Sequence, residues 1–371
     1  MVHQSITDDQ SSQRITETST DTLNFVPEEI WESLNALKPS SRTAFVSAAV
    51  IPQLIPQFRE LYIQGVTTCA YLCSLSVDHV ATGLLDLGWG CGYRNCQMLL
   101  TYVEAYQKPY SRIIRHIPDI EGLQILLEKA WADQFDPQGA EQLKHRVHRT
   151  RKWIGTTEVY TILTYLGIRC SIVDFATPSG PNNAHDALFD WVQRYFEGAD
   201  TDIVPADTEK TEQHTTITDR PPIYLQHSGH SRTIIGIEVL PDGKRNLLIF
   251  DPGKRVPQAN HTEKSSADAK VPDKVDSMSD PAAKPSSTVS GGNGWWFFSG
   301  WMNWQPLFGN NLRNIRVDSK TISRNKQYQL LVLGDISSSS NTLPWTDARG
   351  YILDAQEREQ RKKITSVIGS R

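Results

Sequence analysis

The order of helical and strand patterns between residues 84 and 255 is the feature that most restricts the fold. Apolar residues recur with helical spacing in four segments, at 91–107, 120–133, 156–166 and 184–196. Runs typical of strands lie mainly after them, at 168–175, 223–226, 232–239 and 247–250. An Asp-Gly turn at 242–243 joins the last two strands as a hairpin. The sequence therefore predicts an α+β fold, with helices packed on a mainly antiparallel sheet.

The segments around this region divide the chain into parts that we expect to fold and parts that we do not. Residues 1–23 are rich in Ser and Thr, and residues 256–294 contain no aromatic residue, Leu or Ile. Neither segment can bury enough apolar surface to order itself. We predict a disordered tail at 1–23, an N-terminal helical arm at 24–65, a folded domain at 66–345 with flexible insertions at 197–220 and 256–294, and a charged C-terminal tail or helix at 346–371.

Two details of the flanking parts can be predicted further. In the N-terminal arm, Pro52 and Pro56 interrupt a helical pattern at 43–64, so we expect that helix to be broken or kinked. After the second insertion, a strand pattern at 328–333 is expected to return to the sheet.

Charge and composition argue against several classes of protein. The 38 Lys and Arg residues do not exceed the 42 Asp and Glu residues, and a nucleic-acid binder usually shows a basic excess, so no nucleic-acid partner is predicted. No apolar run reaches the ~18 residues of a membrane span, so no transmembrane segment is predicted. Five cysteines and the lack of a secretory signal favour a reducing compartment, the cytoplasm and/or the nucleus.

One of the cysteines, Cys91, stands among three glycines where the first helical pattern begins. A thiol at a helix N-terminus has a lowered pKa because the positive end of the helix dipole favours the thiolate. The backbone N–H groups there can also stabilise an oxyanion during acyl transfer. Cys91 is therefore a candidate nucleophile, although a buried cysteine that only fills the core is the commoner case.

A cysteine nucleophile needs a base and a group that orients the base. His230 begins a strand about 130–150 residues after Cys91, the separation typical of papain-like enzymes. Asp251 ends the partner strand of the same hairpin, where its carboxylate can orient the imidazole. Gln226 carries an amide that can donate to the oxyanion. His227 is the competing base, and Asp251 can also be read as part of an ordinary Asp-Pro-Gly turn.

A metal site is not predicted. Cys69 and Cys73 are four residues apart, with His79 nearby, but no second pair completes a zinc site, and the spacing suits buried positions on a helix. No cofactor is expected either.

Three motifs in order resemble those of the zinc-finger ubiquitin-specific peptidases (ZUFSP type), deubiquitinases related to the proteases of the ubiquitin-fold modifier. They are Gly-Trp-Gly-Cys-Gly-Tyr-Arg-Asn at 88–95, Trp-Ile-Gly-Thr-Thr-Glu at 153–158 and the stretch 221–236. The resemblance covers roughly residues 60–255 and implies a papain-like cysteine protease fold. It implies Cys91 as nucleophile, His230 as base, Asp251 as orienting acid and Gln226 in the oxyanion hole.

The same resemblance implies the substrate and its binding residues. It implies hydrolysis of (iso)peptide bonds after the C-terminal glycine of ubiquitin, with ubiquitin and polyubiquitin chains as partners. Asp136, Trp153 and Glu158 match the positions that hold the arginine-bearing tail of ubiquitin, and carboxylates pair well with guanidinium groups. Glu158 can instead only place negative charge in the first turn of its helix, and Trp153 can fill the core. The alternatives are a protease of the ubiquitin-fold modifier and a non-catalytic ubiquitin-binding scaffold.

An aromatic cluster near residue 300 is not explained by these functions. Its four tryptophans are Trp295, Trp296, Trp301 and Trp304. Exposed aromatic residues concentrate at partner and membrane contacts, and such a contact is one interpretation. The interpretation we favour is that the cluster covers the sheet before the last strand.

Overall fold

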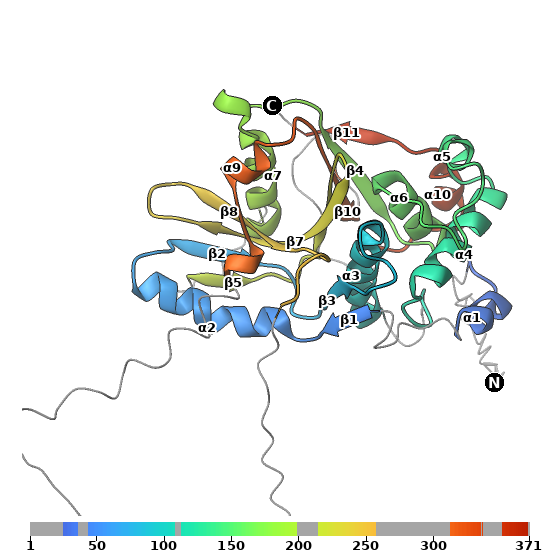
Figure 1. Cartoon of the computed structure of the whole chain (residues 1–371), viewed down its shortest axis with the longest axis horizontal. Coiled ribbons are helices and arrows are strands. Elements are labelled where there is room, and N and C mark those ends of the chain that lie inside the picture. The colour runs from blue at the N-terminus through green and yellow to red at the C-terminus, as the bar shows by residue number, and fades with distance from the viewer. Residues whose placement is uncertain are drawn as a thin grey trace, which may run out of the picture.

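A computed structural model describes residues 25–35, 44–107, 113–198, 214–256, 312–334, 336 and 351–369 (Figure 1). The predicted tail at 1–23, most of the insertion at 256–294 and the tryptophan cluster at 295–304 lie outside these ranges. The helices are α1 (Glu28–Asn35), α2 (Val50–Ile63), α3 (Cys91–Tyr106), α4 (Ile120–Ala132), α5 (Pro137–Gln142), α6 (Thr156–Tyr165), the 3-10 helix η1 (Pro181–Asn183), α7 (Asp186–Glu197), α9 (Ser319–Ile322) and α10 (Ala355–Gln360).

Most strands belong to one large sheet, with the order β11-β4-β10-β6-β7-β2-β5. In addition, β8 pairs with β7, and β9 pairs with β8. β1 and β3 form a separate pair. The strands are β1 (Ala44–Ser47), β2 (Cys69–Leu72), β3 (His79–Thr82), β4 (Cys170–Phe175), β5 (Thr215–Ile217), β6 (Ile223–His227), β7 (His230–Val239), β8 (Arg245–Phe250), β9 (Arg316–Asp318), β10 (Tyr328–Leu333) and β11 (Ser366–Ile368).

Within the large sheet, β11 with β4 and β2 with β5 are parallel, and the other pairs are antiparallel. The predicted α+β fold, with helices on a mainly antiparallel sheet, is thus confirmed.

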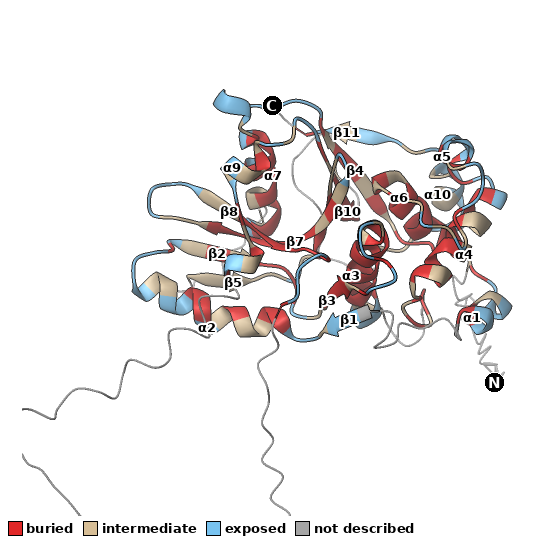
Figure 2. Cartoon of the chain, viewed as in Figure 1, coloured by how far each residue is buried: buried red, intermediate tan, exposed pale blue. Residues whose placement is uncertain are grey.

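The helices cover the sheet and enclose its apolar residues. α3 packs against β7 and β6, α6 packs against β4 and β10, and α7 packs against β7 and β2. Figure 1 shows α3, α4 and α6 on the right of the central strands and α7 on their left. Figure 2 shows the buried residues on α3, α6 and the middle strands, where these layers meet. Among the described residues, no helix is both long and apolar enough to cross a bilayer.

The N-terminal arm differs from the prediction. The expected break at Pro52 and Pro56 is wrong, because α2 is continuous from Val50 to Ile63. Pro52 lies in the first turn, where a helix has no backbone hydrogen bond to lose, so only Pro56 removes one. The buried face that includes Leu54 and Phe58 packs α2 on β2 and β5, which compensates for that loss. Residues 44–47, expected to be helical, form β1.

Four other segments join the sheet that the sequence did not place there, and one of them is β9, which pairs with β8. The segment at 69–73, read as helical, is the strand β2. Within the predicted insertion at 197–220, residues 215–217 form β5 and pair with β2. In the predicted C-terminal tail or helix, α10 is helical, but residues 366–368 form β11 beside β4. Strands of three or four residues have too short a pattern to recognise, and their partners are distant in sequence.

Candidate active site

The thiol of Cys91 lies at the first residue of α3, which packs on β7. Gly92, the next residue, comes so close to the carbonyl group of Ile154 that a Cβ there would collide with it. Glycine at this position therefore allows the segment before α6 to lie directly against the first turn of α3. The cysteine is half-buried, so it is enclosed by the protein but remains reachable.

His230 and Asp251 meet Cys91 from the sheet. His230 begins β7, and its imidazole lies close enough to the thiol of Cys91 for each group to shift the pKa of the other. Its Nε2 lies 3.0 Å from Oδ1 of Asp251, which directly follows β8. Because Nε2 faces Asp251, the other ring nitrogen, Nδ1, is left to exchange a proton with the thiol. The structure thus brings together the three residues that the sequence predicts as nucleophile, base and orienting acid.

The charges of the three groups support one another. Burial alone would raise the pKa of Cys91, but its hydrogen bonds with His230 and Ser231 outweigh burial and lower the pKa of the thiol. The hydrogen bond with Asp251, followed by that with Cys91, raises the pKa of His230 to about 9. Burial would raise the pKa of Asp251, yet His230 and Arg232 keep it below the usual value. This arrangement favours a thiolate beside an imidazolium near neutral pH.

Asp251 is itself held by groups that the sequence analysis missed. Arg232 donates from Nε to Oδ2 at 3.0 Å, and the backbone N–H of Gly253 donates to Oδ1 at 2.9 Å. His230 and Arg232 are two residues apart on β7, so they lie on the same face of the strand. This alternation was the signal in the sequence that could have placed Arg232 near Asp251, and the hydrogen bond establishes the contact.

The opposite face of β7 fixes α3 against the sheet. Asn95, one turn after Cys91, donates from Nδ2 to Oγ of Ser231 at 3.1 Å and accepts from Oγ1 of Thr233 at 2.7 Å. Ser231 and Thr233 are fully buried. Because Asn95 also donates to the backbone oxygen of Cys91, this network sets the position of the cysteine relative to His230. In the sequence, the polar residues in the first turns of α3 were the signal that could have pointed to this network.

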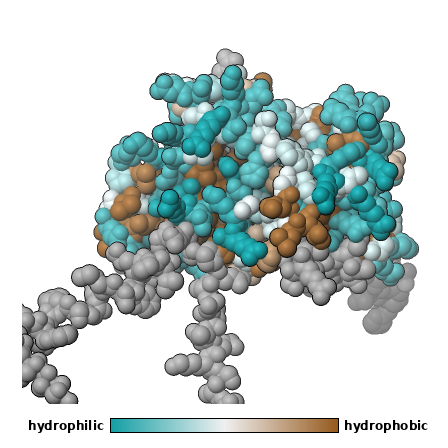
Figure 3. All heavy atoms as spheres, in the orientation of Figure 1, coloured by the Kyte–Doolittle hydropathy of each residue, from teal (hydrophilic) through white to brown (hydrophobic). Residues whose placement is uncertain are grey.

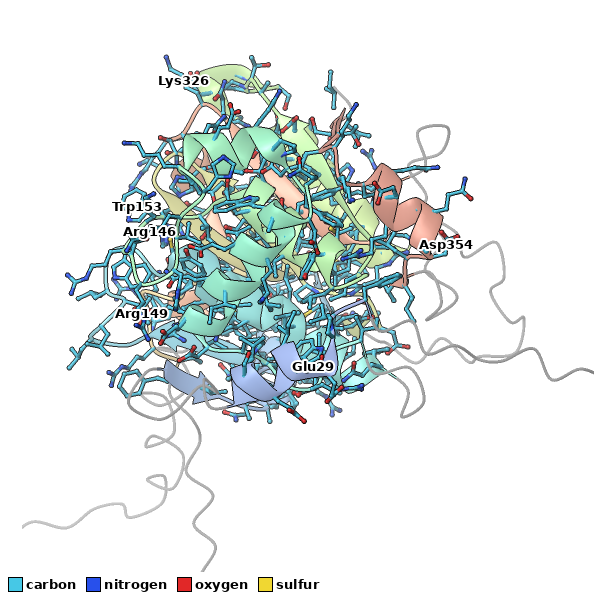
Figure 4. The ribbon with its side chains drawn as sticks, turned by 90° about the vertical axis from the view of Figure 1, so that its right-hand side faces the viewer. Glu29, Arg146, Arg149, Trp153, Lys326 and Asp354 are labelled. Carbon is cyan, nitrogen blue, oxygen red and sulfur yellow. The ribbon has the colours of Figure 1, made fainter. Side chains whose placement is uncertain are left out.

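One wall of the site is the segment before α6. Ile154 lies against Gly92, and the ring of Trp153 lies beside Gly229, close to where a Cβ of that residue would be. Gly229 has a φ of 81°, which allows the tight turn from β6 to β7 that ends at His230. The half-exposed indole of Trp153 projects from the molecule near Arg146 and Arg149 (Figure 4). These contacts place the segment before α6 against both the first turn of α3 and the turn that ends at His230.

Gln226 lies near the end of β6, just before the turn to His230, but its amide serves the protein backbone. Its Nε2 donates to the carbonyl oxygens of His227 at 2.7 Å and His230 at 3.2 Å. Its Oε1 accepts from the hydroxyl of Tyr224 at 3.0 Å. In this structure Gln226 therefore braces the turn, and donation to an oxyanion requires the side chain to rotate. That role stays a prediction.

The two carboxylates predicted to hold a basic tail are both buried and used within the protein. Glu158 accepts from the backbone N–H of Gly155 at 2.7 Å, which caps α6; the alternative interpretation placed Glu158 in this first turn but did not predict the cap. Asp136 caps α5 by accepting from the N–H of Gly139 at 3.1 Å, and burial raises its pKa. Its Oδ2 is buried and has no hydrogen-bond partner among the described residues. Of the predicted tail-binding residues, Trp153 is the one that lies beside the catalytic turn.

The remaining candidates are less suited to this chemistry. His227 directs Nδ1 to the carbonyl of Ser228, and burial lowers its pKa. Burial raises the pKa values of the thiols of Cys69, Cys73 and Cys96. Within the part of the chain that the structure describes, no three His, Cys, Asp or Glu side chains cluster as metal ligands.

A thiol at the start of a helix, packed against a sheet that supplies the imidazole and the carboxylate, is the arrangement of papain-like proteins. The class defined by the fold and the site is thus that of the cysteine peptidases.

Comparison with known proteins gives the family. Residues 66–284 match the model of peptidase family C78. A ubiquitin carboxyl-terminal hydrolase, mug105 of Schizosaccharomyces pombe, is 35% identical over 202 residues, which are 53% of this chain and 72% of that protein. The chain therefore belongs to peptidase family C78, whose members are papain-like cysteine peptidases.

Longer relatives match over part of their length. The zinc finger-containing ubiquitin peptidase 1 of Rattus norvegicus is 42% identical over 197 residues, and that of Homo sapiens is 46% identical over 182 residues. The matches cover 52% and 48% of this chain but 32% and 29% of those proteins. A crystal structure of UfSP from C. elegans is similar with a TM-score of 0.32 and 16% identity, over 50% of this chain and 27% of that one.

Proposed function

We propose that this chain is a deubiquitinating enzyme that hydrolyses the (iso)peptide bond after the C-terminal glycine of ubiquitin, including bonds in polyubiquitin chains. The observation that carries the proposal is that Cys91, His230 and Asp251 meet at the start of α3, with His230 hydrogen-bonded to Asp251 and beside the thiol of Cys91. The relatives at 35–46% identity are named as ubiquitin peptidases or hydrolases, which supports ubiquitin as the modifier. We propose the cytoplasm or nucleus as the compartment, where free thiols such as these persist.

The chemistry that we propose follows from the positions of the three groups. The thiolate of Cys91 attacks the carbonyl carbon of the last glycine, and backbone N–H groups at the start of α3 stabilise the oxyanion. The imidazolium of His230 donates its proton to the departing amine, so that an acyl-enzyme remains. His230 then removes a proton from water, which hydrolyses the thioester and restores the thiol. Asp251 keeps the imidazole oriented and stabilises its charged form throughout.

We propose that the tail of the substrate reaches Cys91 through a narrow passage beside Trp153, which suits a substrate that ends in two glycines. Gly92 lies against Ile154 and Gly229 lies beside Trp153, and a tail without side chains can fit between such close contacts where a bulky residue cannot. We propose that Trp153 lines this passage. We also propose that Asp136, with its unpaired Oδ2, and Glu158 contribute negative charge for the arginines of the tail.

The experiment that tests the proposal is a reaction with ubiquitin that carries a C-terminal electrophile, followed by mapping of the adduct. We expect one covalent adduct, on Cys91, and none with the Cys91→Ala chain. The ubiquitin-fold modifier with the same electrophile is the matched probe. Labelling by that modifier alone would make the ubiquitin-fold modifier, and not ubiquitin, the substrate. Labelling by neither would favour the alternative of a non-catalytic ubiquitin-binding scaffold.

A further inference from the structure

The loop between β3 and α3, residues 83–90, exposes apolar side chains next to the catalytic cysteine. Leu84 is 88% exposed, and Leu85 and Leu87 are each 67% exposed. We call this segment the leucine loop. Figure 3 shows a hydrophobic patch on the face of the molecule where Figure 1 places α3 and β1. An apolar cluster that faces solvent at the edge of a site indicates a contact with another molecule.

The leucine loop is exposed because an ion pair occupies its interior. Asp86 accepts two hydrogen bonds of 2.9 Å from Arg94 of α3, and both side chains are only 2% exposed. The backbone N–H of Gly83 also donates to Asp86, at 2.9 Å. The indole of Trp89 donates to the backbone oxygen of Leu85 at 3.0 Å. These bonds hold the loop in one shape with its leucines outward, and a surface ordered in advance binds at a lower entropic cost.

The leucine loop and the wall formed by Trp153 and Ile154 flank Cys91 from opposite sides. Gly92 contacts Ile154 of the wall, whereas Arg94 contacts Asp86 of the loop. With 3.6 residues per turn, positions 92 and 94 point about 160° apart around α3. Asn95, which reaches the sheet through Ser231, points between them, on the same side as Cys91. A substrate that crosses the start of α3 therefore contacts the wall with one half and the leucine loop with the other.

We infer that the leucine loop is a docking surface for the protein that is released by the reaction. This inference rests on the proposed function, in which the glycine tail lies in the narrow passage beside Trp153. The departing amine, on the other half of the scissile bond, is then on the side of the leucine loop. In a polyubiquitin chain the occupant is the ubiquitin whose lysine is released, which would present an apolar surface to Leu84, Leu85 and Leu87.

The test compares substrates that differ in the departing group alone. The variant Leu84→Ser/Leu85→Ser/Leu87→Ser is assayed on the isopeptide-linked diubiquitin that the wild type cleaves fastest, and on ubiquitin with a small fluorogenic amine. We expect the ratio of kcat/KM for diubiquitin to that for the fluorogenic substrate to fall about tenfold, mainly through KM, as a loss of about 1.4 kcal/mol of binding free energy would give. The single variant Leu84→Ser, at the most exposed position, is expected to lower the ratio about threefold.

A matched control removes exposed apolar residues elsewhere. Ile63→Ser/Val66→Ser/Ile368→Ser changes residues that are 68%, 44% and 83% exposed, near the end of α2 and in β11, and should leave the ratio unchanged. An unchanged ratio in both leucine variants, or a wild type that cleaves the fluorogenic ubiquitin but no diubiquitin, would overturn the docking surface alone. A wild type that cleaves neither substrate would overturn the proposed function and this inference with it.

Discussion

Two cysteines on α3, five residues apart, show how differently the same side chain behaves in two parts of one helix. Cys91 begins the helix, is half-buried and hydrogen-bonds with His230 and Ser231, and its pKa is lowered although burial opposes this. Cys96 lies in the second turn, is fully buried among apolar residues, and burial raises its pKa to about 12. One helix thus carries a thiol that ionises readily and a thiol that stays neutral.

The difference is caused by the neighbours of each thiol. Cys91 faces the start of β7, where an imidazolium and a hydroxyl stabilise the thiolate, and it lies where the helix dipole is positive. Among the residues that the structure describes, no such partner of Cys96 offsets the loss of water. The reactivity of a cysteine in this protein is therefore a property of the contact between helix and sheet. Three predictions test this comparison.

The largest effect is expected from removing each thiol in turn. Cys91→Ala should lower kcat/KM for a fluorogenic ubiquitin by a factor on the order of 10⁶, as the loss of a nucleophile does in other peptidases. Cys96→Ala, the matched control, should keep the activity and lower the free energy of unfolding by about 1 kcal/mol, because it leaves a small cavity. Steady-state kinetics and denaturant unfolding measure the two effects. Similar activity in both variants would remove Cys91 as the nucleophile.

The second prediction concerns the pH dependence of the two thiols. The pKa of Cys91 is lowered and burial raises that of Cys96, so at pH 7 Cys91 should react with iodoacetamide much faster than Cys96. Alkylation of Cys91 should rise as pH passes its lowered pKa and then level off. Hydrolysis should decline as pH rises through about 9, where His230 loses the proton that the departing amine needs.

Mass spectrometry of each cysteine after timed alkylation measures the contrast. Asp251→Asn provides the control, because without the carboxylate the pKa of His230 falls and the thiolate of Cys91 loses its stabilisation. Alkylation of Cys91 at neutral pH should then slow, while that of Cys96 should stay the same. Equal rates for Cys91 in the wild type and in Asp251→Asn would contradict the coupling.

The smallest effect is expected for Arg232, which we regard as a positioning residue. Arg232→Gln removes the ion pair with Oδ2 of Asp251, and kcat should fall about tenfold with little change in KM, since a shift in transition-state stabilisation of about 1.4 kcal/mol corresponds to this factor. Arg232→Lys keeps the positive charge and should restore part of the loss. A change in KM alone, or no rescue by lysine, would indicate that Arg232 acts in another way.

Much of the fold was predictable because its longer elements have clear patterns. The helices α3, α4, α6 and α7 and the strands β4, β6, β7, β8 and β10 lie within a few residues of the predicted segments. The short strands β2, β5 and β11 were not predictable. Each depends on a partner far away in the chain, such as β4 for β11, and not on a periodic pattern of its own.

The sequence by itself predicted that Cys91, His230 and Asp251 lie together, because glycines mark close approaches and a hairpin brings the two ends of its strands together. It did not show that Arg232 shares Asp251, or that Asn95 ties α3 to β7.

The sequence also could not decide where Gln226 points or whether Glu158 caps its own helix. Nor did it show that an ion pair turns three leucines outward. Those outcomes depend on which of several possible partners a polar side chain meets. Only the packing of α3 against the sheet and its flanking loops settles that choice.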